Sequence, residues 1–406
     1  MALGRTLGEL TGQGRGKVLL FCWLGWVFDF FDLILFSFLM TAIAGDLGLS
    51  VSADVPWIVG WTLAATAVGG FVFGRLADRR GRRFAITLSI LVYSGGAFAT
   101  AFADGYWTLL MARVFTGLGV GGEWGVGHAI VAETYPSRLR GRAAGILQAG
   151  APVAMGAAAA VACFVGPEIG WRACFMLAGL PALLAFAARW MIPGEDRAPG
   201  RDGGQLMDLF RGELLRPSAS ILLLLMLHMT AFWCTYAWLP KVLMQELEAD
   251  VASVGWFFLG VNAVHVLADV LFGFLADRFG RKRVFTVFCL SFALGLALVS
   301  MGYEALRGDL MSFGVAIGLV GLGAGTWSCF GVLFAENYDE RVRATAAAGF
   351  YNLSRGVQLF SQSMMVWLFA VTGTFAVALH VGAVASALSA AVIWWVPAAE
   401  AARRRR

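Results

Sequence analysis

The chain has 406 residues, of which 59% are hydrophobic and 14% are charged. Soluble domains usually carry about 25% charged residues, so this composition indicates a protein whose surface faces lipid. The net charge is +5, but the basic residues lie between apolar runs rather than along one helix face, which argues against a nucleic-acid-binding protein. All six cysteines fall within apolar runs, and no pair has the spacing of metal ligands.

Apolar runs long enough to cross a bilayer recur along the whole chain. A membrane-spanning helix needs about 20 mainly apolar residues, and helices are favoured because backbone groups in lipid must bond within their own segment. We therefore predict an all-α integral membrane protein with twelve transmembrane helices. The predicted spans are 18–43, 57–76, 84–103, 107–130, 143–165, 171–192, 219–241, 252–275, 284–302, 310–334, 344–370 and 375–396.

Lys and Arg residues are distributed unequally between the two sides of these spans. Of 31 such residues, 26 lie on one side, many of them in the segments 75–83 and 278–283. Loops rich in Lys and Arg stay on the cytoplasmic side of a membrane. We therefore expect a multi-pass protein of the plasma membrane, the inner membrane of a cell that has two, with both termini in the cytoplasm.

The chain contains an internal repeat. The ten residues Gly74–Arg83 return nearly unchanged as Gly273–Lys282, and Glu133–Arg140 is similar to Glu336–Arg343. Such duplicated bundles are typical of proteins that move solutes across membranes. We predict an N-terminal six-helix bundle at 1–192, a cytoplasmic linker at 193–218 and a C-terminal six-helix bundle at 219–406.

The repeated sequence Gly-x-Leu-Ala-Asp-Arg-x-Gly-Arg-Arg/Lys resembles a motif of the major facilitator superfamily. In addition, Arg113–Trp124, Glu133–Arg140 and the first-span sequence Asp29-Phe-Phe-Asp32 are similar to the sialate:proton symporter family, and related aromatic-acid symporters share much of this pattern. The resemblance implies twelve helices in two pseudo-symmetric bundles, and proton-coupled transport of an organic acid by alternating access. The seventh span lacks the signature of eukaryotic monocarboxylate carriers, which argues against a lactate-type substrate.

Asp29 and Asp32 are candidates for proton coupling. Burying an ionisable residue in a span costs at least about 2.5–3.5 kcal/mol, so such a residue usually has a function. The two lie three positions apart, on one helix face. Two carboxylates at this separation resist being ionised together, so one of them can bind and release a proton. The alternative is that one simply pairs with Arg113.

Arg113 and Glu123 in the fourth span are the other coupling candidates. A guanidinium stays protonated, so Arg113 needs a carboxylate partner or an anionic ligand. The superfamily resemblance implies a role for Arg113 in proton coupling, whereas an ion pair with Asp29 or Asp32 would make it a helix-packing residue. Glu123 fits a proton site and a structural contact equally well.

Arg355 is the candidate anchor for a substrate. It lies in a polar stripe at helical spacing, in a span without acidic residues. An arginine without a local partner can bind a carboxylate through two parallel hydrogen bonds. The alternative is an ion pair with a carboxylate of another span, such as Asp269. The predicted substrate-binding residues are Arg355, Tyr351, Asn352, Gln358 and Gln362.

Asn262, His265 and Asp269 share one face of the eighth span. A histidine titrates near physiological pH, and the carboxylate four residues on can orient it. A satisfied polar contact between helices is an equally good interpretation.

The two charged hinges are candidates for gating. Asp78 and Asp277 lie beside the inner ends of their helices, each among arginines. Contacts between these carboxylates and guanidinium groups of the other half would hold the outward-open state, although the arginines also fix topology by themselves. The predicted gating residues are Gly74, Asp78, Arg79, Gly81, Arg82, Gly273, Asp277, Arg278, Gly280 and Arg281.

These features predict a secondary active transporter rather than an enzyme. The sequence has no phosphate-binding loop for ATP, so we expect no cofactor and a proton gradient as the driver. The expected partners are a small organic anion, protons and the lipid bilayer, and we expect a monomer. The alternative function is a proton-driven exporter of hydrophobic or cationic compounds.

Overall fold

The computed structural model describes residues 12–50, 54–192, 206–236, 238–239, 242, 251–301, 310–339, 341–374 and 376–397. Within these residues the fold is helical and has no β-strand. The first half contains η1 (Gly12–Gly14), α2 (Arg15–Leu47), α3 (Val55–Arg80), α4 (Arg82–Thr100), α5 (Tyr106–Thr134), α6 (Ser137–Gln148), α7 (Gly150–Ala160), the π-helical turn η2 (Val161–Val165), α8 (Gly166–Ala178) and α9 (Ala182–Met191). The second half contains η3 (Leu206–Phe210), η4 (Gly212–Leu214), α10 (Leu215–Tyr236), α12 (Val251–Phe279), α13 (Arg281–Met301), α15 (Leu310–Ala324), η6 (Gly325–Trp327), α16 (Ser328–Asn337), α17 (Arg343–Gly356), α18 (Gln358–Thr372) and α19 (Ala376–Val392).

Helices occupy all twelve predicted spans. Several spans are broken into shorter pieces, such as 310–334, which becomes α15, η6 and α16. By length and apolarity, eight segments of the described chain can each cross a membrane, and one of them, Leu139–Ala188, covers two predicted spans. Helix α10 begins at Leu215, inside the predicted linker, and residues 193–205 of that linker lie outside the described residues.

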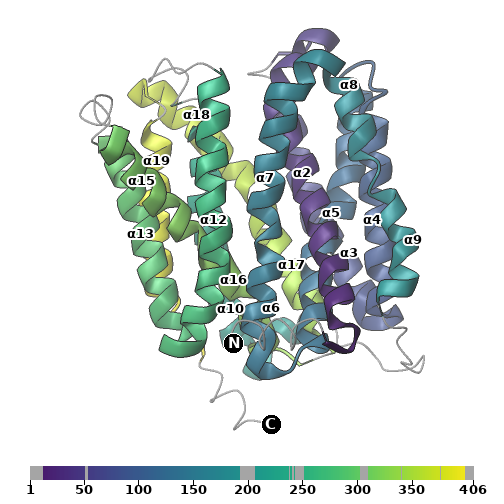
Figure 1. The fold of residues 1–406 in the computed structure, drawn as a ribbon, viewed down its shortest axis with the longest axis vertical. Coiled ribbons are helices and arrows are strands. Elements are labelled where there is room, and N and C mark those ends of the chain that lie inside the picture. The colour runs from purple at the N-terminus through teal and green to yellow at the C-terminus, as the bar shows by residue number, and fades with distance from the viewer. Residues whose placement is uncertain are drawn as a thin grey trace.

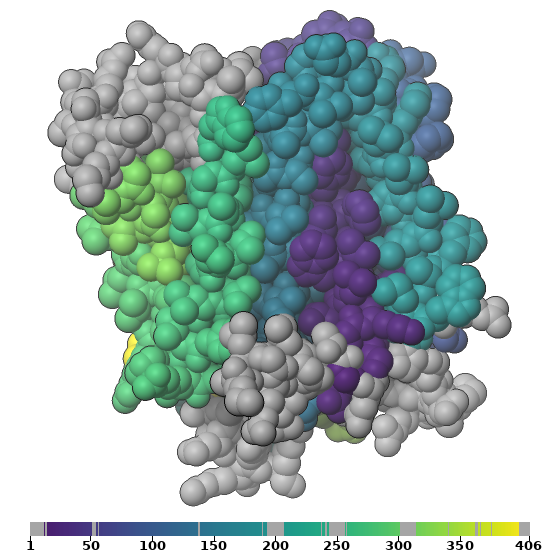
Figure 2. All heavy atoms as spheres, in the orientation of Figure 1, coloured from purple at the N-terminus to yellow at the C-terminus, as the bar shows by residue number. Residues whose placement is uncertain are grey.

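The helices form two bundles that face each other (Figure 1). Helices α2 to α9 pack together in the N-terminal bundle, and α10 to α19 pack together in the C-terminal bundle. The bundles meet where α12 packs on α6 and α7, along the middle of the face seen in Figure 2. They also meet where α17 packs on α3 and α5. Helix α17 is therefore the part of the C-terminal bundle that is most deeply engaged with the N-terminal one.

Glycine permits the tight turns between the paired helices of each repeat. Gly81, between α3 and α4, has φ = 102°, and Gly280, between α12 and α13, has φ = 89°. Residues with a Cβ atom rarely adopt such angles. The equivalent turns place both copies of the charged motif at the same end of the molecule, which we call the motif end.

Both described ends of the chain also lie at the motif end. Arg15, the first residue of α2, interacts electrostatically with Tyr135, which follows α5. Lys282 at the start of α13 donates a hydrogen bond to the carbonyl of Val396, which follows α19. This arrangement agrees with an even number of membrane crossings.

Candidate transport site

A narrow cavity lies between the two bundles, and both bundles contribute to its wall. Much of the lining consists of the aromatic rings of Phe30, Phe232, Trp233, Trp327 and Tyr351. The polar lining residues are Gln148 of α6, His265 of α12 and Arg355 of α17. A mostly apolar lining with a few convergent polar groups is usual for a small-molecule binding site, and in this closed arrangement the cavity has a volume of about 10 Å³, room for about one water molecule.

Arg355 reaches this cavity without a carboxylate partner. Its side chain is 1% exposed, and it forms no ion pair with any described residue. One of its Nη atoms donates to the hydroxyl of Tyr351 at 3.2 Å, while Nε and the other Nη have no hydrogen-bond partner. The guanidinium carbon lies 5.7 Å from the ring centroid of Phe30 and 4.9 Å from that of Tyr351. The two aromatic rings thus stabilise the cation, and its Nε and one Nη remain available to bind a ligand.

The other predicted substrate-binding residues divide into three groups. Tyr351 lines the cavity beside Arg355. Asn352 donates instead to the carbonyl of Gly121 at 2.6 Å, so it joins the two bundles. Gln358 donates to the carbonyl of Ser354 at 3.0 Å, and neither Asn352 nor Gln358 lines the cavity. The side chain of Gln362 lies outside the described part of the chain.

Arg113 and Asp32 form a buried ion pair inside the N-terminal bundle. The separation is 2.9 Å, and both side chains are 1% exposed. The guanidinium carbon of Arg113 also lies 4.7 Å from the ring of Phe36 and 5.8 Å from that of Phe175. Neither Arg113 nor Asp32 lines the cavity. The sequence left open whether Asp29 or Asp32 pairs with Arg113, and in the structure the partner is Asp32.

Asp29 has no hydrogen bond or ion pair with any residue in the described part of the chain. It is 0% exposed, and neither carboxylate oxygen has a hydrogen bond in the structure. It interacts electrostatically with Arg355 of the opposite bundle and with Asp32 of its own helix. A buried carboxylate without a hydrogen bond is costly as an ion.

Glu123 is a second carboxylate without a hydrogen-bond partner. It is 1% exposed and interacts electrostatically with Asp29. Its carboxyl group packs directly against Gly25 of α2, where a Cβ atom would lie 2.1 Å from a Glu123 oxygen and would force the carboxyl group to move. Three buried acids, Asp29, Asp32 and Glu123, therefore share this region with two guanidinium groups, those of Arg113 and Arg355.

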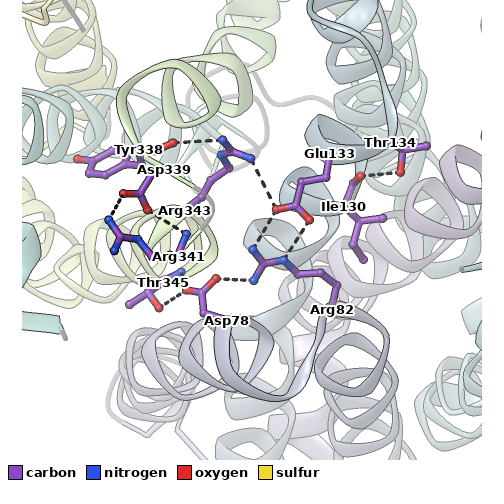
Figure 3. Close-up of polar contacts among 10 residues, drawn as sticks. All are labelled: Asp78, Arg82, Ile130, Glu133, Thr134, Tyr338, Asp339, Arg341, Arg343 and Thr345. Carbon is purple, nitrogen blue, oxygen red and sulfur yellow. Dashed lines mark hydrogen bonds and ion pairs between the residues drawn. The ribbon is translucent and has the colours of Figure 1, made fainter. Parts of the chain in front are cut away.

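The motif end is closed by a polar network that joins the bundles (Figure 3). Asp78 accepts hydrogen bonds from the backbone N–H of Thr345, at 2.9 Å, and from its hydroxyl, so the carboxylate lies at the N-terminus of α17. Asp78 also pairs with Arg82 of its own bundle, and Arg82 pairs with Glu133 at 3.0 Å. Glu133 in turn lies 3.6 Å from Arg343 of the C-terminal bundle.

The sequence prediction for this network was partly wrong about partners. It expected Asp78 to meet a guanidinium group of the other half, whereas its contact across the interface is the start of α17. A helix N-terminus attracts a carboxylate because its first N–H groups are unpaired and its dipole is positive there. Glu133, Arg343 and Thr345 were absent from the predicted set, although the repeat of Glu133–Arg140 at Glu336–Arg343 was a usable signal.

The second copy of the motif makes weaker contacts across the interface. Asp277 lies 3.8 Å from Arg142 of the N-terminal bundle, and both side chains are more than a quarter exposed. Arg281 pairs with Glu336 within its own bundle. The remaining predicted gating arginines, Arg79 and Arg278, are exposed.

Two motif glycines allow the bundles to approach at equivalent points. A Cβ atom on Gly74 would lie 2.8 Å from the carbonyl oxygen of Ala344, and one on Gly273 would lie 3.0 Å from that of Gly141. The predicted gating glycines 74 and 273 are therefore packing positions between bundles. Gly81 and Gly280 instead form the turns described above.

The fold and this site define a membrane transporter, in which two helical bundles enclose a cavity between them. A family model described as Major Facilitator Superfamily matches residues 22–218 and 221–406. The chain belongs to the Major Facilitator Superfamily. It is a multi-pass membrane protein and not an enzyme, and the predictions of fold class and family are confirmed.

Named relatives agree with this assignment. The chain is 31% identical to a putative metabolite transport protein of Haemophilus influenzae, over 84% of this chain and 86% of that protein. It is 30% identical to a probable 4-methylmuconolactone transporter of Cupriavidus pinatubonensis, over 83% and 79% of the two chains. More distant relatives, at 26–28% identity, are named as transporters of niacin, sialic acid, cis,cis-muconate and gentisate.

The fold also matches solved structures. The structure of the proton:xylose symporter XylE superimposes with a TM-score of 0.78 at 18% sequence identity, covering 94% of this chain and 95% of that one. At this identity the likeness concerns the arrangement of the helices.

Proposed function

We propose that this protein is a proton-coupled symporter that carries a small organic carboxylate across the membrane by alternating access. The observation that carries the proposal is a pair of opposite charges across the interface, Arg355 on α17 and Asp29 on α2, neither of which forms an ion pair with any described residue. Each belongs to a different bundle, so their interaction depends on how the bundles are arranged.

Arg355 supplies the substrate site. Its unpaired Nε and Nη atoms can donate to carboxylate oxygens, and such charge-assisted hydrogen bonds are among the strongest in proteins. The surrounding rings of Phe30, Trp327 and Tyr351 exclude water and offer apolar surface to the rest of the substrate. The relatives named for muconate, gentisate and sialic acid transport support an organic acid as the substrate class.

Asp29 supplies the proton site. The substrate competes with Asp29 for Arg355, and this competition couples proton binding to substrate binding. In the empty protein Asp29 interacts electrostatically with the guanidinium of Arg355 across the interface. A substrate carboxylate bound to Arg355 neutralises that guanidinium, so an ionised Asp29 would then be a buried anion without a compensating charge. Taking up a proton removes this cost, so substrate and proton bind together.

The ion pair between Arg113 and Asp32 and the carboxyl group of Glu123 complete the coupling region. Arg113 and Asp32 neutralise each other, so they fix α5 against α2 and leave the exchangeable proton to Asp29. Glu123 interacts electrostatically with Asp29, and we assign it the role of a second proton acceptor in this region.

Transport follows when the two bundles rock about this site. The network around Asp78 and the packing of α17 on α3 and α5 hold the motif end closed, and release of these contacts opens it. We place the motif end in the cytoplasm of a plasma membrane because of its excess of Lys and Arg. The driver is the proton gradient, no cofactor takes part, and the working unit is a monomer.

Uptake into proteoliposomes tests the proposal. Labelled sialic acid, cis,cis-muconate, gentisate and lactate are offered with the outside acidic and the inside alkaline. We expect at least one acid to accumulate above its external concentration, and a protonophore to abolish the accumulation. If no acid accumulates and the same gradient expels a lipophilic cation such as ethidium instead, the exporter is the correct function.

A further inference from the structure

The C-terminal bundle contains a buried ionisable pair of its own. His265 and Asp269 lie one turn apart on α12, with Nε2 of the histidine 3.4 Å from Oδ2 of the aspartate. Their side chains are 1% and 0% exposed. Ser328 donates to the other carboxylate oxygen of Asp269 at 2.8 Å. Among the described residues no Lys or Arg forms an ion pair with Asp269, so the imidazole is its nearest possible cation.

The pair is connected to the central cavity on one side only. His265 lines the cavity together with Arg355, whereas Asp269 does not. The imidazole therefore lies between the cavity and the carboxylate. Nε2 and Oδ2 lie 3.4 Å apart and neither has a hydrogen-bond partner among the described residues, so a small rotation of either side chain would join the imidazole and the carboxylate by a hydrogen bond.

Among the described residues, the surrounding elements supply no Lys, Arg, Asp or Glu side chain in an ion pair with His265 or Asp269. On α12 itself, Asn262 donates its amide to the carbonyl of Phe258. On α10, His228 is bonded to Thr326 at 2.9 Å and interacts electrostatically with His265, and Tyr236 interacts electrostatically with Asp269. Two arginines on neighbouring helices pair with other carboxylates: Arg142 with Asp277, and Arg281 with Glu336. Two further polar side chains, Gln148 and Arg355, lie in the cavity wall.

We propose that His265 and Asp269 together bind one exchangeable proton, so that the C-terminal bundle has its own proton site that opens to the cavity. With one proton the pair is electrically neutral, which the apolar interior tolerates. Without it, a carboxylate remains in the core with Ser328 as its sole direct hydrogen-bond donor in the described structure. An anion that enters the cavity beside His265 adds negative charge and therefore favours the protonated pair.

This inference rests on the proposed symport for its role in transport, because it adds a second proton to the one carried by Asp29. The proton site itself needs no substrate. Its ligand is the proton, so it is measurable in the empty protein, and the two proposals can fail separately.

Infrared difference spectroscopy of the substrate-free protein in lipid, recorded between acidic and alkaline pH, tests the site. We expect the wild type to show pH-dependent carboxyl and imidazole bands. Asp269→Asn, which keeps an oxygen to accept from Ser328, is expected to lose one carboxyl component. His265→Gln is expected to lose the imidazole component and to leave the remaining carboxyl group unresponsive to pH.

His380→Gln is the control for removal of a histidine, because His380 lies on α19 of the same bundle, is exposed and does not line the cavity. Its carboxyl bands are expected to equal those of the wild type. If Asp269→Asn and His265→Gln both give the wild-type difference spectrum, the pair exchanges no proton and the inference is overturned. Should Asp269→Asn fail to fold, the His265→Gln spectrum decides alone. If the proteoliposomes show no acid uptake but the carboxyl band assigned to Asp269 still responds to pH, the proposed symport is rejected and the proton site at His265 and Asp269 is retained.

Discussion

Tyr351 lies flat against Trp124, with the ring centroids 3.9 Å apart and the planes 12° from parallel, although the two residues belong to opposite bundles. Trp124 is fixed by a 3.0 Å hydrogen bond from its indole nitrogen to Gln148. The hydroxyl of Tyr351 accepts from Arg355, so one side chain is both part of the interface and a neighbour of the proposed substrate site. Filling the site and separating the bundles therefore act on the same residue.

Trp124→Ala should favour the state that is open at the motif end. An aromatic pair contributes about 0.5–1.5 kcal/mol beyond its buried area, so we expect the open population to rise by about 2- to 10-fold. Spin labels at the exposed positions Arg80 and Arg341, in a background without the native cysteines, report the opening as a longer distance. Tyr351→Phe keeps the stacked rings and is the control; a similar opening in that variant would contradict the role of stacking.

Gly125→Ala should prevent the motif end from closing. A Cβ atom at position 125 would lie 2.3 Å from the backbone of Ala348 on α17, and backbone cannot move aside as a flexible side chain can. Overpacking of this kind costs about 1–3 kcal/mol, and here it falls on the closed state alone. We expect transport to decrease at least about fivefold while the protein stays folded. Gly95→Ala is the matched control, because nothing lies within 4 Å of the added atom; equal activities in both variants would refute the prediction.

Asp78→Asn should slow transport more than Asp277→Asn does. The carboxylate of Asp78 accepts a hydrogen bond at the N-terminus of α17 and pairs with Arg82, and the side chain is 2% exposed. Asp277 makes one 3.8 Å contact and is 28% exposed, and exposed pairs contribute about 0–1 kcal/mol. We expect Asp78→Asn to reduce the maximal rate by about 10-fold or more, since charge-assisted hydrogen bonds contribute about 1.5–3 kcal/mol. Initial uptake rates measure this, and a change in KM alone would contradict it.

Arg355→Lys should weaken substrate binding while the charge is kept. An ammonium group cannot form the two parallel hydrogen bonds that the guanidinium offers, so we expect KM to rise by about 10-fold or more. Arg341→Lys, an exposed change at the motif end, controls for the general effect of the substitution. An unchanged KM in Arg355→Lys would remove Arg355 from the substrate site.

Asp29→Asn and Asp32→Asn should have different effects although the residues lie one turn apart. Asp29 has no direct partner, so its neutral substitute is tolerated, but accumulation driven by the pH gradient is lost. Asp32 pairs with Arg113, and removing one partner of a buried pair typically costs about 3–5 kcal/mol. We expect a lower melting temperature for Asp32→Asn and near-normal stability for Asp29→Asn. Normal pH-driven accumulation by Asp29→Asn would show that the proton binds elsewhere.

The sequence predicted the helices well because their cause is local. Every backbone group in lipid must bond within its own segment, so a run of about 20 apolar residues is sufficient to specify a helix. The breaks within spans, such as those between α15 and α16 and between α17 and α18, were not predicted. They lie inside continuous apolar or small-residue runs and depend on how neighbouring helices pack there.

By itself, the sequence determined the twelve spans, the duplicated halves and the presence of buried charges, since composition and repetition along the chain express these directly. Only the tertiary structure decided which charges meet. It paired Arg113 with Asp32, used Asn352 to join the bundles, set Asp78 at the start of α17, and left Arg355 and Asp29 without direct ionic partners. Each of these outcomes depends on contacts between helices that are far apart in the chain, and spacing within one helix carries no information about them.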